Sequence, residues 1–520
     1  MAEPPARPSL LWPGQVRARL ARWEWGPLTA AYVLAVAVRW SILDAHPYTA
    51  EAAHYAMSLH LWNGVGNVGS LFSDVRPDDF SWFFWQRPLL CLLYWPAAQL
   101  GFEAYRGAHV LVAGAVPVLA AVLLRHLAVP RPYAYGAAAV LAVHPVLVPW
   151  GVLVLPDTTV AAFVLAGLLA AHDGRPAATA ASLLAGAWVK EVAIVATATL
   201  LLLALWREAD GSRARLWPLR LGRFATALLP AAALSVVPLG ASLLLPGAAV
   251  PGFRIGGGLD QSLERLFLLV WLAPLPAIGL LVPRVRRLCL VALAWPAFFV
   301  AYHLATGKAI EVWYNVVPAT MVLCAAAATL GLAPRDGPAP RRWAPAAASV
   351  AVTLLLAVQV TVSGGSAANR AVVTPLSQGG QWSLEEALAY ERVREDDLFT
   401  VLDAIPPDHD GVWTALNMDY SLVMHPLATR AGFVHKDFTP EWDMPDDAIR
   451  WWADAVETRA DATILVVGDD SMSRALPEAY AACATTAGMY AVIVPDACQG
   501  YADRLIEAWH RHHDPDAAAS

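Results

Sequence analysis

The sequence predicts an α-helical membrane protein that crosses the bilayer about eleven times and carries an α/β domain at its C-terminal end. Three observations support this prediction. Of 520 residues, 58% are hydrophobic and only 15% are charged, whereas soluble globular chains carry about 25% charged residues. Apolar segments alternate with clusters of arginine, and the composition turns acidic after residue 362. The 22 tryptophans fit a protein with many membrane interfaces.

The N-terminal residues 1–25 are expected to lie in the cytoplasm. This polar, proline-rich stretch carries four arginines, and positive charge favours the cytoplasmic side of a membrane. The apolar segment 26–43 that follows is longer than the core of a typical signal peptide and contains Arg39. We therefore interpret it as a retained first span that runs outward.

Arginine clusters at 125–131, 207–223, 284–287 and 335–342 all fall on the cytoplasmic side when the apolar segments cross in alternation. A long external loop, 44–105, follows the first span. Its apolar stretch 88–100 falls short of the ~20 residues that a span needs, so we expect an interfacial or re-entrant helix. The further spans are expected at 109–124, 133–153, 158–171, 177–189, 192–205, 224–245, 266–282, 288–305, 316–332 and 344–362. Residues 26–362 thus form one transmembrane domain.

Residues 363–520 are expected to form a soluble domain on the extracytoplasmic face, because the last span runs outward. This part has 26 acidic and 10 basic residues. Alternation of strands and helices predicts an α/β layer. The expected strands are 411–416, 462–467 and 489–494, and the expected helices are 445–458, 473–486 and 501–510. For Cys483 and Cys498, a disulfide and two free thiols both stay open.

Ionisable residues near the outer ends of the spans are the candidates for chemistry, because such groups are costly near lipid unless they are solvated, paired or used. Each also has a structural explanation. Glu51 in the loop 47–55 could be solvated, Asp157 could cap a helix, and Lys190 could pair with Glu191. Two further candidates are arginines that could have a structural role instead. Arg87 could anchor the chain at the membrane interface, and Arg39 could extend its side chain to the outer surface by snorkelling.

The first external loop resembles that of the GT-C superfamily of membrane glycosyltransferases, in the branch of the protein O-mannosyltransferases and aminoarabinose transferases. The resemblance lies in Pro47, Glu51-Ala52 and Tyr55-Ala56. The resemblance covers roughly residues 25–330, over which short motifs occur in the same order as in the family. The other matching segments are Arg87-Pro88-Leu89-Leu90 with Tyr94-Trp95, Gly101 with Tyr105-Arg106, Leu155-Pro156-Asp157, Gly186 with Val189-Lys190-Glu191, and Trp313-Tyr314 with Pro318.

The resemblance implies transfer of a sugar from a polyprenyl- or dolichyl-phosphate donor to a glycan, lipid or protein acceptor on the extracytoplasmic face. Such transfer needs a general base and cations that hold the phosphate. We assign Glu51 as the base and Asp157 as the second acid, and we expect both to converge with Arg87 and Lys190 on one cavity open to the outer leaflet. The candidates for substrate binding are Arg87, Lys190, Glu191, Arg39, Tyr55 and Tyr314. No ligand spacing demands a metal, a divalent metal held by these acids stays open, and nothing indicates a nucleic-acid partner.

Two departures from the family pattern keep other functions open. Ala50 stands where the family has the first acid of an Asp-Glu pair, and the arginine expected before Tyr314 is missing. The chain could therefore be a catalytically degenerate membrane partner or scaffold that presents its acidic C-terminal domain. A transporter would instead predict inverted repeats and polar residues in the middle of spans, and neither is clear.

Overall fold

A computed structural model describes residues 24–41, 43, 51, 54, 55, 58, 88–144, 147–208, 214–216, 219–244, 274–282, 285–306 and 316–332, five strands after residue 410, and residue 507. The chain divides into two compact units. The first contains 1–44, 103–239 and 257–375, and the second contains 45–102, 240–256 and 376–520. The two units are treated separately below.

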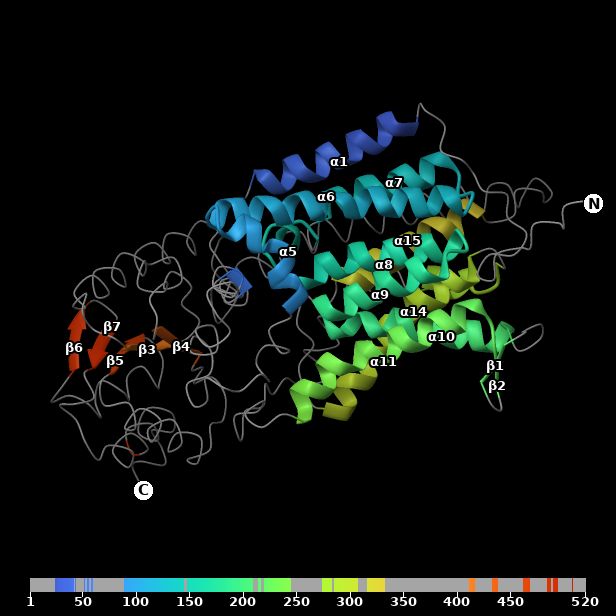
Figure 1. Ribbon diagram of the computed structural model, residues 1–520. Helices are drawn as coiled ribbons and strands as arrows, with labels where there is room; N and C mark the ends of the chain where they lie inside the picture. The colour runs from blue at the N-terminus through green and yellow to red at the C-terminus, as the bar shows by residue number, and fades with distance from the viewer. Residues whose placement is uncertain are drawn as a thin grey trace, which may run out of the picture. The chain divides into compact units, whose positions relative to one another are not determined.

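The first unit is a bundle of apolar helices (Figure 1). Its helices are α1 (Trp25–Trp40), α6 (Phe102–His126), α7 (Arg131–Val143), α8 (Pro156–His172), α9 (Pro176–Val189), α10 (Ile194–Glu208), α11 (Arg223–Leu244), α13 (Pro274–Gly279), α14 (Arg286–Thr306) and α15 (Val316–Leu332). Helix α8 packs along α9, α1 along α7, and α15 against α7, α8 and α14. The predicted α-helical class is therefore confirmed.

Proline and glycine set several of the helix boundaries. Pro156 and Pro176 begin α8 and α9, where the fixed φ of proline suits the first turn and its missing N–H is not needed. Gly174, with φ of 72°, ends α8, and the Arg175 amide donates to the Ala170 carbonyl at 2.9 Å. A left-handed residue followed by this bond reverses the chain in a few residues, which brings α9 back along α8.

The expected span 133–153 is shorter in the structure. Helix α7 ends at Val143, and His144 is extended with φ of −62° and ψ of 126°. The following residue is Pro145, whose ring disfavours helical geometry at the residue before it. A short 3₁₀ helix, η2 (Pro149–Gly151), then leads toward α8. For the expected span 266–282, the described residues contain only the short helix α13.

Contacts between helix ends show that the bundle helices alternate in direction. At one end, which we call the Glu24 end, the buried Glu24 accepts from Arg125 at 2.9 Å and from Arg131 at 3.2 Å. These contacts join the start of α1 to the end of α6 and the start of α7. At the other end, which we call the Asp157 end, the last turn of α1 contacts the last turn of α7 through Arg39 and Ala142.

By length and hydropathy, α6 is the one helix in the described part of the chain that could cross a membrane. Shorter apolar helices of 10–17 residues lie in α5 (Pro88–Ala98), α8, α9, α15 and parts of the α10 and α11 regions. The expected helix at 88–100 is thus present as α5. The predicted number of spans remains a prediction, and the expected span 344–362 lies outside the described residues.

Strands lie in two places. A hairpin of β1 (Ala214–Leu216) and β2 (Leu219–Leu221) falls within the expected cytoplasmic loop 207–223. In the second unit, the sheet order is β4-β3-β5-β7-β6, parallel from β4 to β5 and antiparallel beyond. The strands of this sheet are β3 (Gly411–Leu416), β4 (Phe433–Asp437), β5 (Ala462–Val467), β6 (Ala484–Ala487) and β7 (Tyr490–Ile493).

The predicted strands correspond to β3, β5 and β7, whereas β4 was not predicted. Strand β6 corrects the end of the predicted helix 473–486. Its two central residues are threonines, which are enriched in strands, and the strand pairs along β7. Several predictions for this unit lie outside the described residues. They are the rest of that helix, the expected helix 445–458, the expected helix 501–510 except residue 507, and the cysteines 483 and 498.

Helices α1 and α6 approach closely at Gly114. A Cβ atom there would lie 2.7 Å from Val36 Cγ2 and 3.0 Å from Tyr32 Cε2. We expect Gly114→Ala to force α1 outward and to lower the free energy of unfolding by about 1–3 kcal/mol, the usual cost of overpacking. The measurement is thermal unfolding of the purified protein, followed by circular dichroism.

Gly136→Ala in α7 is the matched control, because a Cβ at Gly136 meets nothing within 4 Å. This variant should gain about 0.5–1 kcal/mol through helix propensity alone. Equal effects of the two substitutions would contradict close packing of α1 on α6.

Candidate functional site

Lys190 lies at a break between two helices. Helix α9 ends at Val189, Lys190 is extended with φ of −157° and ψ of 132°, and the short 3₁₀ helix η3 (Glu191–Ala193) leads into α10. The backbone at the break is hydrogen-bonded, because the Lys190 amide donates to Gly186 and its carbonyl accepts from Ala193. Between the expected spans 177–189 and 192–205, the chain thus breaks at the extended Lys190, which directs its side chain away from the helical path of α9.

Asp157 and Lys190 form a buried ion pair. Lys190 Nζ lies 2.9 Å from Oδ1 and 2.8 Å from Oδ2 of Asp157, and each side chain is 1% exposed. Asp157 occupies the first turn of α8, where the helix dipole also favours a negative charge. Helix capping does not explain Asp157, because Leu155 is the N-cap residue of α8. The acid that Lys190 binds through both carboxylate oxygens is Asp157.

The carbonyl of Trp150 connects this ion pair to α6. It accepts a hydrogen bond from Thr158 Oγ1 at 2.6 Å and lies 3.3 Å from His109 Nε2. Thr158 is the neighbour of Asp157 in α8, and all of these side chains are buried. A continuous polar connection therefore runs from α6 through η2 to the start of α8.

Arg39 lies buried at the same end of the bundle and does not snorkel. Arg39 is 3% exposed. Its Nη atoms donate to the carbonyls of Ala35, Ala142 and Leu147 at 2.9–3.3 Å. The Ala142 carbonyl belongs to the last turn of α7, whose dipole favours a cation. Within the described part of the chain, Arg39 Nε has no hydrogen-bond partner, and no ion pair of Arg39 is formed.

Gly151 makes room for this arginine. A Cβ atom at position 151 would clash with Arg39 Nε and would lie 2.9 Å from Arg39 Cδ. The guanidinium is thus pressed against the backbone of η2, next to the Trp150 carbonyl. The sequence "Pro-Trp-Gly" at 149–151 therefore couples Arg39 to the start of α8.

Arg106 and His109 are residues of this end that the sequence analysis did not select. Arg106 is buried in α6 and donates from Nη1 to the Leu43 carbonyl at 2.8 Å. It belongs to one of the motifs that carried the family resemblance, which is the signal that could have identified it. His109 falls one helical turn further along α6, on the same face at a spacing of three residues, and nothing in the sequence marks it.

The predicted base, Glu51, belongs to the second unit together with Tyr55. Glu51 is fully buried, which excludes a solvated loop carboxylate. Tyr55 packs edge-on against Phe102 with ring centroids 5.1 Å apart, and burial raises the pKa of its phenol. The convergence of Glu51 with Asp157 stays a prediction, because the two residues lie in different units.

Three of the other candidates are less defined. Glu191 is partly buried at the start of η3. Arg87 and Tyr314 lie outside the described residues. Of the residues predicted from the sequence, the structure therefore brings together Asp157 and Lys190 and places Arg39 at the same end of the bundle.

Comparison with known proteins does not assign the chain to a family. No model of a protein family matches the chain, and no curated protein matches it in sequence. The resemblance to membrane glycosyltransferases therefore rests on the short motifs alone.

We expect Asp157→Asn and Lys190→Met each to lower the free energy of unfolding by about 3–5 kcal/mol, because each leaves the partner's charge buried and uncompensated. The double variant should lose clearly less than the sum of the two. The measurement is a double-mutant cycle on the purified protein, using thermal unfolding. Glu103→Gln, at an exposed carboxylate in the first turn of α6, is the neutral control. Additive losses would show that the two side chains do not interact.

Proposed function

We propose that the chain is an integral membrane protein with a cytoplasmic N-terminus and an extracytoplasmic C-terminal domain. Large apolar side chains are exposed on α1, α6, α7, α10, α11 and α13, whereas soluble proteins rarely expose wide apolar surfaces. Trp25 and Trp40, 61% and 51% exposed, mark the two ends of α1. Tryptophan at both ends of an apolar helix is typical of the two interfaces of a bilayer.

The charges at the two ends of the bundle support this orientation. Arg125, Arg131 and Arg223 lie at the ends of α6, α7 and α11 that the positive-inside rule assigns to the cytoplasm. The Glu24 end of the bundle is then cytoplasmic. The Asp157 end, with Arg39 and Lys190, is then on the outer side.

Orientation can be tested by labelling single cysteines with a membrane-impermeant maleimide in sealed cells. Of the five native cysteines, three are buried, and the other two are removed by Cys483→Ser and Cys498→Ser. We expect Glu103→Cys to be labelled from outside and Arg175→Cys only after permeabilisation, since these exposed residues lie at opposite ends of the bundle. Labelling of both from the same side would exclude the proposed topology.

For the activity, we propose transfer of a sugar from a polyprenyl-phosphate donor to a glycan, lipid or protein acceptor. The observation that carries this proposal is the buried Arg39, which backbone carbonyls hold and to which no acid is bound among the described residues. It lies at the same end of the bundle as the Asp157–Lys190 pair. A guanidinium kept in an apolar bundle without a carboxylate is suited to a phosphate, and ionisable groups inside membranes mark functional sites.

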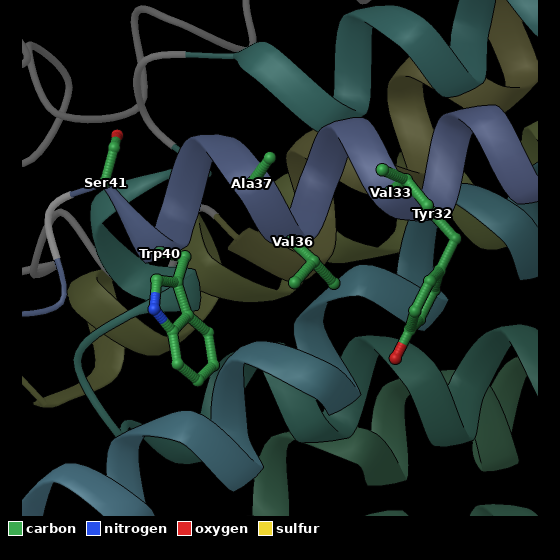
Figure 2. Close-up of a pocket in the computed structure, with 6 residues that line it drawn as sticks. All are labelled: Tyr32, Val33, Val36, Ala37, Trp40 and Ser41. Atoms are coloured by element: carbon green, nitrogen blue, oxygen red, sulfur yellow. The ribbon is translucent and has the colours of Figure 1, made fainter.

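An open apolar groove along α1 suits the hydrocarbon chain of such a donor (Figure 2). Its volume is about 440 Å³. Tyr32, Val36 and Trp40 point into it from one side of the helix, as Figure 2 shows, and Tyr32 donates from its hydroxyl to the Leu111 carbonyl of α6. The groove reaches Ser41, at the end of α1 that carries Arg39.

In this proposal Glu51 takes the proton of the acceptor hydroxyl or amine while the bond between the sugar C1 and the phosphate oxygen breaks. The lipid phosphate leaves with the bonding electrons, and cationic side chains stabilise its charge. Asp157 holds Lys190 in position, since the carboxylate binds the ammonium through both oxygens. The chemistry does not require a divalent metal.

The second candidate is a scaffold on the same frame without catalysis. Ala50, at the position of the family's first acid, and the mutual neutralisation of Asp157 and Lys190 favour it. Such a protein would bind partners through its acidic C-terminal domain and would retain that binding when Glu51 or Asp157 is changed.

The deciding experiment supplies the reconstituted protein with polyprenyl-phosphate mannose and polyprenyl-phosphate glucose labelled in the sugar, together with cell-envelope acceptors. We expect loss of label from the lipid, and a 10²–10⁴-fold slower rate in Glu51→Gln, about the contribution of a general base. Glu103→Gln should keep the full rate. No turnover of either donor by the unmodified protein, or an unchanged rate in Glu51→Gln, would favour the scaffold.

A further inference from the structure

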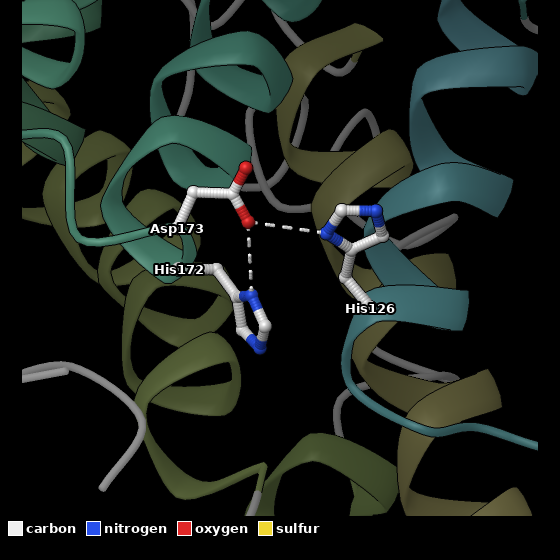
Figure 3. A group of neighbouring side chains, drawn as sticks. All are labelled: His126, His172 and Asp173. Atoms are coloured by element: carbon white, nitrogen blue, oxygen red, sulfur yellow. Dashed lines mark hydrogen bonds and ion pairs between the residues drawn. The ribbon is translucent and has the colours of Figure 1, made fainter. Parts of the chain in front are cut away.

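A second cluster of chemistry-bearing side chains lies at the Glu24 end of the bundle, where α6 and α8 finish. Figure 3 shows His126 and His172 turned toward the carboxylate of Asp173. Both histidines face it through Nδ1, at 3.3 Å for His126 and 3.6 Å for His172 from the same Oδ1 atom. The two rings are in edge contact, with centroids 5.7 Å apart.

This cluster is distinct from the site proposed above. Asp157 and Asp173 stand at opposite ends of α8, a helix of 17 residues and therefore about 25 Å long at 1.5 Å per residue. None of the residues given a role in sugar transfer lies in the cluster. An activity at one end does not explain the side chains at the other.

The spacing of the three ligand atoms fits a transition metal. Zinc binds histidine nitrogen and carboxylate oxygen at 2.0–2.2 Å in tetrahedral sites, which separates any two ligand atoms by about 3.4 Å. Two of the three distances here are 3.3 and 3.6 Å, and all three atoms lie within 4.8 Å of one another.

The surroundings favour a cation and leave access to it. The last turns of α6 and α8 both end at the cluster, so that two helix dipoles present their negative ends. The neighbouring Arg125 is bound to the buried Glu24 and directed to α1. The side chain of His172 is 3% exposed, but those of His126 and Asp173 are 19% and 18% exposed, which leaves a side open for water.

We propose that His126, His172 and Asp173 bind a divalent transition metal of the zinc class, with water as the fourth ligand. Two imidazoles and one carboxylate are a donor set that zinc, cobalt and nickel accept. The metal would join the end of α6 to the turn between α8 and α9, on the side of the membrane opposite to the proposed sugar transfer. The competing explanation is a contact between His126 and Asp173 that needs no metal.

The experiment uses the full-length protein in detergent and titrates it with Co²⁺ and Zn²⁺ alone. The starting protein carries His510→Gln, His512→Gln and His513→Gln, because this histidine-rich tail could bind metal by itself. We expect one Co²⁺ per chain with the intense visible absorption of a tetrahedral site, displacement by Zn²⁺, and a higher melting temperature with metal.

His126→Gln, His172→Gln and Asp173→Asn should each weaken the affinity by more than the roughly 10–100-fold that loss of a supporting outer group costs. His144→Gln, at a buried histidine in the same unit, is the matched control and should bind like the parent. If His172→Gln does not fold, the more exposed His126 and Asp173 decide the result. Absence of binding in the parent, or equal affinity in His126→Gln and Asp173→Asn, would overturn the proposal in favour of a contact without metal.

Discussion

The ion pair between Asp157 and Lys190 is the interaction on which the arrangement of the bundle depends. Two unit charges are held with 1% exposure in an apolar interior, where either charge alone would be strongly destabilising. The pair fixes the start of α8 relative to the break after α9. Through Thr158 and the Trp150 carbonyl, it also fixes the 3₁₀ segment against which Arg39 lies. The polar end of the bundle is thus one connected unit.

The two ends of the bundle differ in chemistry. At the Glu24 end, an acid neutralises Arg125 and Arg131, and histidines surround Asp173. At the Asp157 end, the Nη atoms of Arg39 bind the carbonyls of Ala142, in the last turn of α7, and of Leu147. The first end is built from ion pairs near the surface, and the second from charges sealed among helices. This asymmetry is the reason for assigning different roles to the two ends.

Much of the helical fold could be predicted, because apolar length and proline positions determine it. The segments 177–189 and 316–332 were predicted to within a residue of α9 and α15. The prediction failed at Pro145, where a proline inside an apolar run ended the helix. It also failed at β6, where two threonines and pairing with β7 favour a strand at the end of the expected helix. The sequence placed Asp157 and Lys190 in one expected cavity but did not predict the ion pair between them, because 33 residues separate the two and helix packing sets their contact. Glu51 was selected from its place in the first external loop, whereas its burial could not be predicted, because the packing around a loop residue is not visible in the sequence.

The order in which the paired charges occur along the chain has a consequence for how the protein is made. Asp157 is synthesised before Lys190, so in the proposed membrane setting α8 on its own would carry an uncompensated carboxylate, which is costly near lipid unless it is paired. The glycine turn at Gly174 lets α9 fold back along α8 and bring the ammonium of Lys190 to that carboxylate. If α8 and α9 cross a bilayer as proposed, we expect them to insert together as a helical hairpin.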